Sequence, residues 1–510
     1  MRHLIVLLLC VGCGASPVFV PTPDAEVEVP EVDAGVVVPE RDAGVNPPAS
    51  LRETFANAPF SSVVKQRVSG AGLRVRRAGE LTFILGFARN ELDMVSRRLV
   101  ASRDGVEVWS LEEGLDERFT DFALHPSGEL TVGVERRSAQ SDAFDLLRVN
   151  AQGVVLHRQV LARPSLPAGD LAPAFLMRSV RDGSNVRAWW PWLRLEAHGE
   201  DVIIGLLSYA DVIGAPKDSE FVSAVISLHW ENATFTERWA RLVDGTHPII
   251  NVVWQYDDFL WLDAAMRLIV DVAPDGSVVV GRTLGNGRCN SLRDRFQEAT
   301  DAQCRAYRSH GSTHRYQPFA YTSFSADGAR LGTQVLTPEG LEEFVVFDMA
   351  VRGDRVAVAG VSVKIDAPSY RDPWGTEISP YDGYLAVVQN GVIETERFVD
   401  VGGRGDLLSA LTWTDQGLLA VGASDWNRWT GGMSLSRGAQ PMLAMDPLDG
   451  SPLITRTLPT QDKSRHTHLV DVDVQGSDVL AVGPADAPMT HSGDAAVAPM
   501  ANGSIELRLR

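Results

Sequence analysis

Two kinds of tight turn recur in a fixed order along this chain of 510 residues, and that recurrence restricts the fold more than any other feature. One copy of the pattern occupies residues 120–160. Its apolar residues alternate in four short runs, as half-buried strands require. The turn at residues 125–128 joins the first two runs, and the turn at 150–153 joins the last two. This copy is therefore predicted to form a sheet of four antiparallel strands.

The same unit recurs from the N-terminal third of the chain to its end. The first turn glycine is found at Gly79, Gly128, Gly199, Gly276, Gly353, Gly417 and Gly476. A second glycine follows each of them, at Gly86, Gly133, Gly205, Gly281, Gly360, Gly422 and Gly483. The second hairpin is expected to turn at residues 103–105, 150–153, 231–232, 327–328, 390–391, 449–450 and 502–503. Asn, Asp and Gly suit these positions because tight hairpins need a positive φ.

Seven copies of a four-stranded unit predict an all-β protein, a β-propeller with seven blades of four antiparallel strands. Six or eight blades are the alternatives. In another all-β fold the glycines would only mark ordinary turns, but the constant order of the two turns favours the propeller. The closure of the ring stays open: residues 63–68 supply an outer strand to the last blade, or residues 505–509 complete that blade alone.

The first 12 residues have the pattern of a lipoprotein signal peptide. A basic start precedes an apolar run at residues 4–11 that is too short to span a bilayer. The run ends in Cys10-Val11-Gly12-Cys13, which resembles the lipobox of bacterial lipoproteins, although Cys10 stands where that family usually has leucine. The resemblance implies lipidation of Cys13. Because no aspartate follows Cys13, it also implies export to the outer membrane or cell surface. A plain secretory peptide with soluble release is the alternative.

Residues 13–50 are predicted to be the lipidated N-terminus and a disordered linker, and residues 51–510 the propeller domain. The linker is rich in Pro, Ala and acidic residues, with Arg41 as its one basic residue, so its charges should repel and keep it extended. Such proline-rich spacers resemble those of Gram-negative surface lipoproteins. The expected contact with the membrane is through the lipid anchor only.

Charge and cysteine content restrict partners and cofactors. A net charge of −19 without clustered Lys and Arg argues against nucleic acid. Outside the signal, Cys289 and Cys304 are the remaining cysteines, and in an exported chain they are expected to form a disulfide. A zinc site with His310 and His314 is the alternative, but the spacing matches no tight zinc pattern. We therefore predict neither metal nor cofactor, and we expect a monomer.

The longest connections are expected between the second and third strands of the blades, all at one end of the ring. Aromatic and acidic side chains concentrate there, and aromatic rings beside carboxylates stack on sugars or anchor peptides. For each of these side chains, packing of its loop onto the blade is the alternative role. The candidate ligand-binding residues are Tyr209, Tyr307, Trp374, Tyr381, Trp426, Trp429 and Asp425.

No catalytic residues are predicted, because the sequence contains no nucleophile elbow, zincin helix or phosphate-binding glycine loop. The repeats, for example residues 272–281, resemble the tandem β-propeller repeats of bacterial exported lipoproteins. That resemblance covers residues 73–510 and transfers no functional residue. The sequence thus favours a lipid-anchored envelope propeller that binds an unknown protein or glycan through its long loops, without catalysis. The alternative is a hydrolase or lyase that acts on an extracellular polymer at the central channel.

Overall fold

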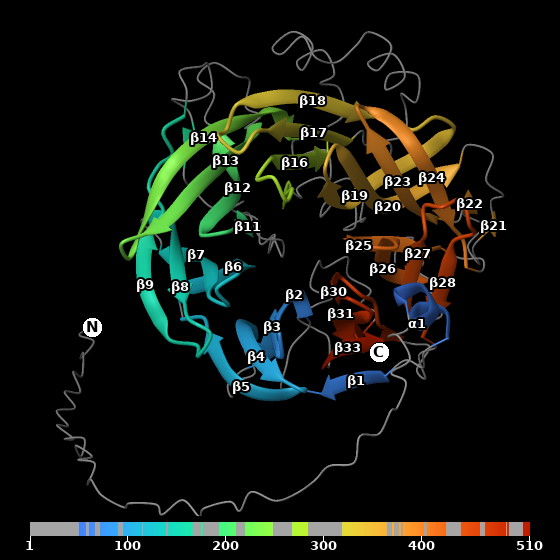
Figure 1. The fold of residues 1–510 in the computed structure, drawn as a ribbon, viewed down its shortest axis with the longest axis horizontal. Coiled ribbons are helices and arrows are strands. Elements are labelled where there is room, and N and C mark those ends of the chain that lie inside the picture. Colours follow the sequence, from blue (N-terminus) through green and yellow to red (C-terminus); the bar gives the residue numbers. More distant parts are fainter. Residues whose placement is uncertain are drawn as a thin grey trace, which may run out of the picture. The chain divides into compact units, whose positions relative to one another are not determined.

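A computed structural model describes the greater part of the chain after residue 49. The described residues are 50–57, 61–66, 72–89, 95–114, 116–138, 141–166, 175–176, 193–210, 220–247, 268–283, 319–364, 370–371, 377–378, 381–401, 405–424, 440–458, 465–485, 487–488 and 503–509. They form a ring of antiparallel sheets in the compact unit Ala49–Arg510 (Figure 1). Seven of these sheets are four-stranded blades, so the predicted all-β propeller of seven blades is confirmed.

The first three blades follow the chain in order. Blade 1 contains β2 (Gly72–Ala78), β3 (Leu81–Arg89), β4 (Val95–Arg103) and β5 (Val106–Glu112). Blade 2 contains β6 (Glu117–Leu124), β7 (Leu130–Ser138), β8 (Ser141–Val149) and β9 (Val155–Val160). Blade 3 contains β11 (Leu193–His198), β12 (Asp201–Ala210), β13 (Glu220–Glu231) and β14 (Thr234–His247), with the short β10 (Phe175–Leu176) also paired to β12.

The next three blades repeat the order. Blade 4 contains β15 (Leu268–Val272), β16 (Val278–Thr283), β17 (Phe319–Phe324) and β18 (Arg330–Leu336). Blade 5 contains β19 (Leu341–Arg352), β20 (Arg355–Lys364), β23 (Asp382–Gln389) and β24 (Val392–Val399). Blade 6 contains β25 (Leu407–Thr414), β26 (Gly417–Ser424), β27 (Gln440–Asp446) and β28 (Ile454–Thr457). Two small ribbons, β21 (Tyr370–Arg371) with β22 (Glu377–Ile378) and β29 (Arg465–His466) with β32 (Ala487–Pro488), lie outside the blades.

Blade 7 joins the two ends of the domain. Its inner strands are β30 (Asp471–Gln475), β31 (Asp478–Ala485) and β33 (Gly503–Leu509), and β1 (Ser61–Gln66) is its outer strand. Ser61 of β1 lies opposite Arg508 of β33. Of the two predicted closures, the structure therefore confirms the one in which the N-terminal segment completes the last blade.

The expected hairpin at residues 502–503 is wrong. Gly503 begins β33, where it pairs with Ala485 of β31, so it starts the third strand of the blade instead of leading into the fourth. An Asn-Gly pair is a local turn signal, whereas the fourth strand here is β1, whose Gln66 pairs with Gly503, 437 positions later in the sequence. Local turn chemistry carries no information about such a long-range pairing.

The first turn glycines have the conformation that their role requires. All seven have φ between 58° and 132°, the left-handed region that disfavours side chains with a Cβ. The second hairpins also turn as expected, with positive φ at Asp104, Asn232 and Asn390. These turns fix the register of strands one and two in each blade, and of strands three and four in blades 1 to 6.

The second glycines are required for a different reason, the close approach of neighbouring atoms. A Cβ on Gly360, Gly422 or Gly483 would lie 1.9–2.0 Å from a backbone carbonyl oxygen of the adjacent inner strand or the residues before it. A Cβ on Gly133 or Gly205 would lie 2.6 and 2.3 Å from side-chain carbons of the next blade, Leu193 and Val270. The repeated glycine thus lets the inner strands and neighbouring blades pack closely.

One short helix, α1 (Leu51–Asn57), precedes the ring and was not expected from the sequence. Seven residues are too few to show a helical period. Leu51 and Phe55 are buried in the core shared by blades 6 and 7. Arg456 Nη1 donates a hydrogen bond to the Phe55 carbonyl at 2.8 Å, which helps to hold the helix end. Within the described ranges, no helix is long and apolar enough to cross a membrane.

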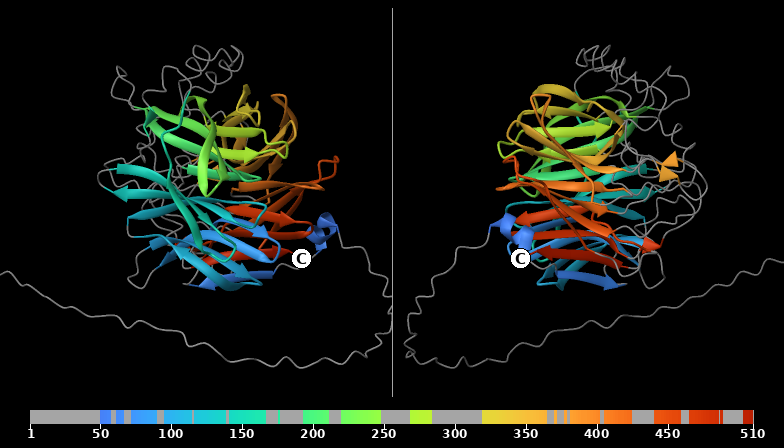
Figure 2. Two further views of the ribbon diagram at one scale, coloured as in Figure 1. Left: turned by 60° about the vertical axis from the view of Figure 1, so that its left-hand side comes forward. Right: turned by 90° about the vertical axis from the view of Figure 1, so that its right-hand side faces the viewer.

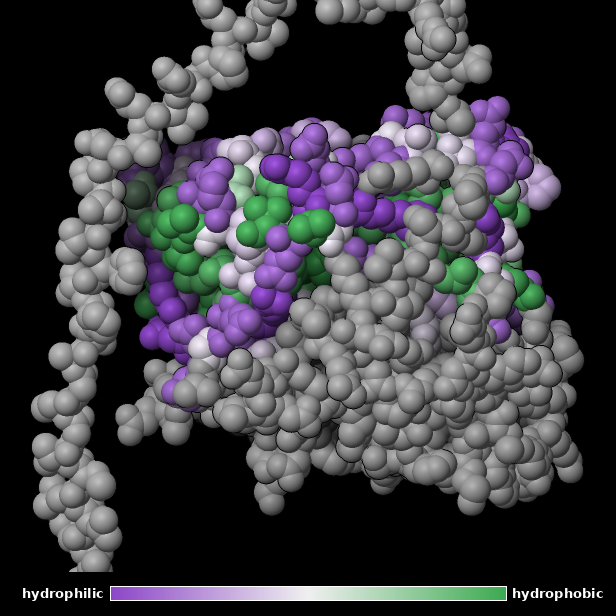
Figure 3. All heavy atoms as spheres, turned by 90° about the horizontal axis from the view of Figure 1, so that it is seen from below, coloured by the Kyte–Doolittle hydropathy of each residue, from purple (hydrophilic) through white to green (hydrophobic). Residues whose placement is uncertain are grey.

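The two faces of the ring differ in the length of their connections. In blades 3 to 7, strands two and three are linked by long segments, such as β16 to β17 and β26 to β27, whereas strands one and two meet at tight turns. The expected division into a long-loop face and a turn face is therefore confirmed. Figure 2 shows the strands running across the thickness of the ring between the two faces. Figure 3 views the rim from the side of β1 and β5, where apolar patches lie among hydrophilic side chains.

Candidate functional site

The centre of the ring is lined by the first strand of each blade, and these strands carry charged side chains. They enclose a cavity of about 250 Å³. Its charged lining residues are Arg74, Arg76, Arg194, Glu196, Asp271, Asp348, Asp471 and Asp473. Because blades 1, 3, 4, 5 and 7 all contribute to this lining, the charges meet only once the ring has closed. We call this cavity the channel site.

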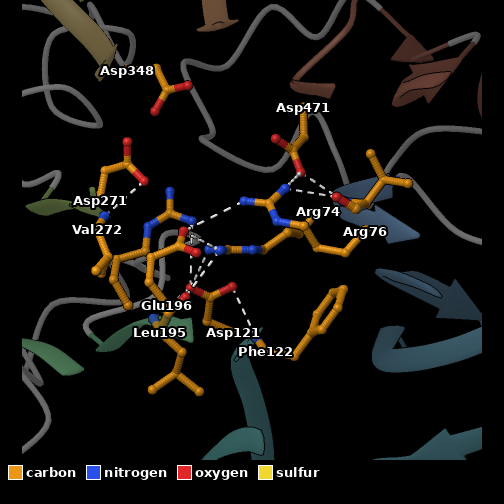
Figure 4. A network of polar contacts seen from close by, with 12 residues as sticks. Arg74, Arg76, Asp121, Phe122, Leu195, Glu196, Asp271, Val272, Asp348 and Asp471 are labelled. Atoms are coloured by element: carbon orange, nitrogen blue, oxygen red, sulfur yellow. Dashed lines mark hydrogen bonds and ion pairs between the residues drawn. The ribbon is translucent and has the colours of Figure 1, made fainter. Parts of the chain in front are cut away.

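Arginines of blade 1 occupy one side of the channel site (Figure 4). Arg74 Nη1 donates to Asp121 Oδ2 at 2.7 Å, and Arg74 Nη2 donates to the Leu195 carbonyl and to Glu196. Arg76 Nη1 donates to Asp471 Oδ2 at 3.0 Å, and its Nη2 lies 3.5 Å from Glu196 Oε1. Glu196 of blade 3 therefore connects both arginines of blade 1 across the centre of the ring.

Both arginines remain charged. Burial disfavours the charge on Arg74 and on Arg76, and for Arg74 the neighbouring Arg76 adds to this effect. The surrounding carboxylates outweigh these effects and raise the pKa of both guanidinium groups above its ordinary value. This side of the channel site is consequently a set of permanent, mutually compensated charges.

Carboxylates in the channel site and directly beside it also hold neighbouring blades together. Asp121, Asp348 and Asp471 each accept a hydrogen bond from the backbone N–H of a residue in the next blade: Leu195 at 2.9 Å, Leu411 at 2.9 Å and Val75 at 2.7 Å. The inner strands bulge just before Asp121 and Asp348, and such bulges redirect a side chain. These bonds join blade 2 to 3, blade 5 to 6 and blade 7 to 1.

Asp271 and Asp348 face each other on the other side of the channel site (Figure 4). Burial raises the pKa of Asp271 to about 7, with a further contribution from the charge of Glu196. Hydrogen bonds from the N–H groups of Val351 and Val272 oppose the shift, and the charge of Asp348 adds to it. No cation among the described residues forms an ion pair with Asp271. Within the described part of the chain, Asp271 is thus a buried acid without a cationic partner.

The raised pKa of Asp271 predicts a specific pH dependence of stability. Between the ordinary pKa of 3.8 and about 7, the folded state retains a proton that the unfolded chain has released, so the free energy of unfolding should fall as pH rises through this window. Asp271→Asn should remove that component. Thermal melts of both proteins between about pH 5 and about pH 8 measure it. Equal pH slopes in the two proteins would show that Asp271 titrates normally.

Arg194 differs from the other two channel arginines because its only ion pair among the described residues is long. Its Nη1 lies 3.8 Å from Asp121 Oδ2, and its side chain is 16% exposed. Most of its donors are therefore not used by any carboxylate in the described part of the chain. Arg194 is the channel cation best placed to contact a ligand.

Two of the residues selected from the sequence, Tyr209 and Tyr381, lie in the described ranges, and neither lines the channel site. Tyr209 belongs to β12, where it pairs with Phe221 of β13. Tyr381 is buried against a cluster of residues from blades 5 and 6, including Phe347 and Leu407, so the structure gives it a packing role. The other predicted residues lie outside the described ranges and stay predictions: Cys13, Cys289, Cys304, Tyr307, Trp374, Trp426, Trp429 and Asp425.

The channel charges were not selected from the sequence, although a signal was present. In five copies a charged residue stands five positions before the first turn glycine: Arg74, Arg194, Asp271, Asp348 and Asp471 precede Gly79, Gly199, Gly276, Gly353 and Gly476. A charge inside an otherwise apolar inner strand is expensive unless it is paired. Its repetition at one place in the repeat therefore indicates a shared location in the fold, which here is the channel.

Comparison with known proteins leaves the family of this chain open. No family model matches the sequence, and no curated protein matches it. Among solved structures, a polysaccharide lyase shares 11% identity at a TM-score of 0.39, covering 86% of this chain and 90% of its own. The β-propeller domain of the Trilobed protease from Pyrococcus furiosus shares 8% identity at a TM-score of 0.30, covering 77% and 98%.

A third solved structure, a puromycin-hydrolysing peptidase from Mycobacterium tuberculosis, shares 11% identity at a TM-score of 0.38. The alignment covers 86% of this chain and 52% of that one. Scores this low carry no argument about activity. The architecture of this protein is instead established by its own strand pairing.

Proposed function

We propose that this protein is an exported, lipid-anchored propeller of the cell envelope that binds a protein or glycan, and that the channel site receives one charged group of that ligand. The observation that carries the proposal is the combination of size and charge in the channel site. A cavity of about 250 Å³ is smaller than the pockets that enclose a whole small molecule. It is large enough for a single side chain or sugar unit that projects from a larger partner.

The arrangement of charges supports binding over catalysis. Asp121, Asp348 and Asp471 accept backbone hydrogen bonds from the next blade, so they are fixed in place. Groups that are held in this way recognise a charge without reorganising, which lowers the cost of binding. A catalytic carboxylate would in addition need freedom to exchange a proton with a substrate.

The N-terminal sequence is what supports the proposed location in the envelope. The lipobox-like Cys10-Val11-Gly12-Cys13 and the acidic linker after it support attachment through Cys13, with the propeller held away from the lipid. Cys13→Ser should release the protein from the membrane fraction, because the acceptor of the lipid is lost. Fractionation of cells that express each form measures this. A Cys13→Ser protein that still sediments with membranes would contradict the anchor.

Ligand binding is tested by screening the purified protein on glycan and peptide arrays. Two variants accompany it: Arg194→Gln, which removes the channel cation with spare donors, and a triple variant with Trp374, Trp426 and Trp429 changed to Ala. We expect the arrays to identify a ligand that the unmodified protein binds at least tenfold more tightly than either variant does. A tenfold change is roughly the effect of one charge-assisted hydrogen bond. Binding that neither variant weakens would contradict recognition through the channel and the loops.

A second candidate function is cleavage of an extracellular polymer at the channel site. Asp271, whose pKa of about 7 suits a general acid or base, is the observation that favours it. The array ligand distinguishes the two functions. If the bound oligosaccharide or peptide is shortened on incubation, and Asp271→Asn abolishes the shortening, the protein is an enzyme; a ligand of unchanged mass supports binding alone.

A further inference from the structure

A second cavity lies on the turn face, away from the channel site. It has a volume of about 440 Å³ and lies where α1 meets the first turns of blades 5 and 6. Its lining includes Arg52 of α1, Arg352 and Arg355 at the turn between β19 and β20, and Trp413, Asp415 and Gln416 of blade 6. We call it the turn-face pocket. Neither the repeat nor the proposed function accounts for three arginines around one tryptophan.

Arg352 is the arginine without an acidic partner. Its Nη1 donates to the Thr414 carbonyl at 2.8 Å, and its guanidinium carbon lies 5.9 Å from the centre of the Trp413 ring. Among the described residues, no carboxylate forms an ion pair with it. The hydrogen bond and the ring orient this exposed guanidinium while its charge and its other donors stay available.

The other two arginines are partly neutralised at the surface. Arg52 Nη1 pairs with Asp449 at 3.0 Å, and Arg355 Nη2 pairs with Glu394 at 2.6 Å. All four side chains are more than a third exposed, so these pairs are weak and screened by salt. Both cations therefore still contribute a positive field at the pocket, in a protein whose net charge is −19.

The rest of the lining suits a ring-shaped ligand that carries hydroxyl groups. Trp413 Nε1 already donates to the Ala350 carbonyl at 3.1 Å, which fixes the indole and leaves its ring as an apolar wall. Asp415 is exposed and forms no ion pair within the described ranges, and a carboxylate accepts hydrogen bonds from hydroxyl groups. A flat apolar wall, an acceptor for hydroxyls and an unpaired guanidinium are thus present together.

We propose that the turn-face pocket binds a sugar ring that carries an anionic substituent. Arg352 contacts the anion, Trp413 packs against the apolar face of the ring, and Asp415 accepts from its hydroxyls. This site is separate from the channel site and does not depend on it. A free anion such as sulfate would make only the contact with Arg352. A neutral sugar would make only the contacts with Trp413 and Asp415.

The proposal is tested by titrating the full-length protein with D-glucuronate and with D-glucose, its neutral counterpart, and following the signals by NMR. D-glucuronate should bind at least tenfold more tightly than D-glucose, and Arg352→Gln should remove that advantage. Arg352→Lys, which keeps the charge but loses the planar donor geometry, should bind with intermediate affinity. Arg103→Gln, at an exposed turn of blade 1, is the matched control and should bind like the unmodified protein.

Several outcomes would overturn the proposal. These are the absence of D-glucuronate binding, equal affinity for D-glucose, an Arg352→Gln variant that binds normally, or displacement of D-glucuronate by sulfate at equal concentration. Melting temperatures of the variants show whether a loss of binding reflects unfolding. Because Arg194→Gln leaves the turn-face pocket intact, failure here and failure of the channel proposal are separate results.

Discussion

Replacing Gly422 with alanine should lower the free energy of unfolding by about 3 kcal/mol or more, the upper range of overpacking substitutions. A Cβ at this position would lie 2.0 Å from the backbone oxygen of Leu407 and 2.9 Å from its carbonyl carbon. Gly422 is in β26, which is paired on both sides, with β25 and with β27. Both of these Leu407 atoms belong to the backbone and not to a flexible side chain that could move away. Blade 6 would therefore have to shift as a whole.

Chemical denaturation of the two proteins measures the loss, and Gly476→Asn is the control. Gly476 has φ of +59° but no atom within 4 Å of the site of a Cβ. Asparagine adopts that conformation at little cost. Gly476→Asn should therefore unfold within roughly 0.5 kcal/mol of the unmodified protein, the usual range for a surface substitution. A Gly422→Ala protein that is equally stable would show that the inner strand relaxes without cost.

These two glycines show how far the sequence determines the fold. The blades were predictable because each repeat contains its own turn signals and a period of two, both of which are local. The two repeated glycines of each copy, such as Gly476 and Gly483 or Gly417 and Gly422, can be recognised in the sequence alone. The first glycine of each copy is required by its positive φ, and the second by the close approach of neighbouring atoms. Only the structure distinguishes these two reasons.

What the sequence left open or missed depends on contacts between distant segments: it offered two closures of the ring, and it did not select the channel site. The pairing of β1 with β33 joins residues more than 400 positions apart, and no local pattern in either strand selects the other. The same holds for the channel site, where Arg74 of blade 1 meets Glu196 of blade 3. A charged residue in an inner strand indicates that it has a partner. Which residue that partner is depends on how the closed ring brings the blades together.

Asp121→Asn should be the most disruptive change beside the channel site and should lower the free energy of unfolding by about 3–5 kcal/mol, the usual cost of breaking a buried ion pair by removing one partner. Asp121 and Arg74 are joined at 2.7 Å, with side chains only 1% and 7% exposed. Asp121 Oδ2 also accepts from the Leu195 N–H of blade 3. The variant would therefore leave a guanidinium under-compensated in the ring centre and weaken the junction of blades 2 and 3.

A double-mutant cycle separates two contributions to this loss of stability: the under-compensated charge of Arg74 and the weakened junction of blades 2 and 3. Arg74→Met removes the cation, and replacement of a buried pair by apolar groups is often nearly neutral. The double variant should therefore be more stable than the sum of the two single losses predicts, by at least about 1 kcal/mol. Asp449→Asn, which breaks the exposed pair with Arg52 at 3.0 Å, should cost no more than about 1 kcal/mol and calibrates the measurement. Strict additivity in the cycle would mean that Asp121 stabilises the ring through the Leu195 hydrogen bond alone, and that the charges at its centre are held by Glu196.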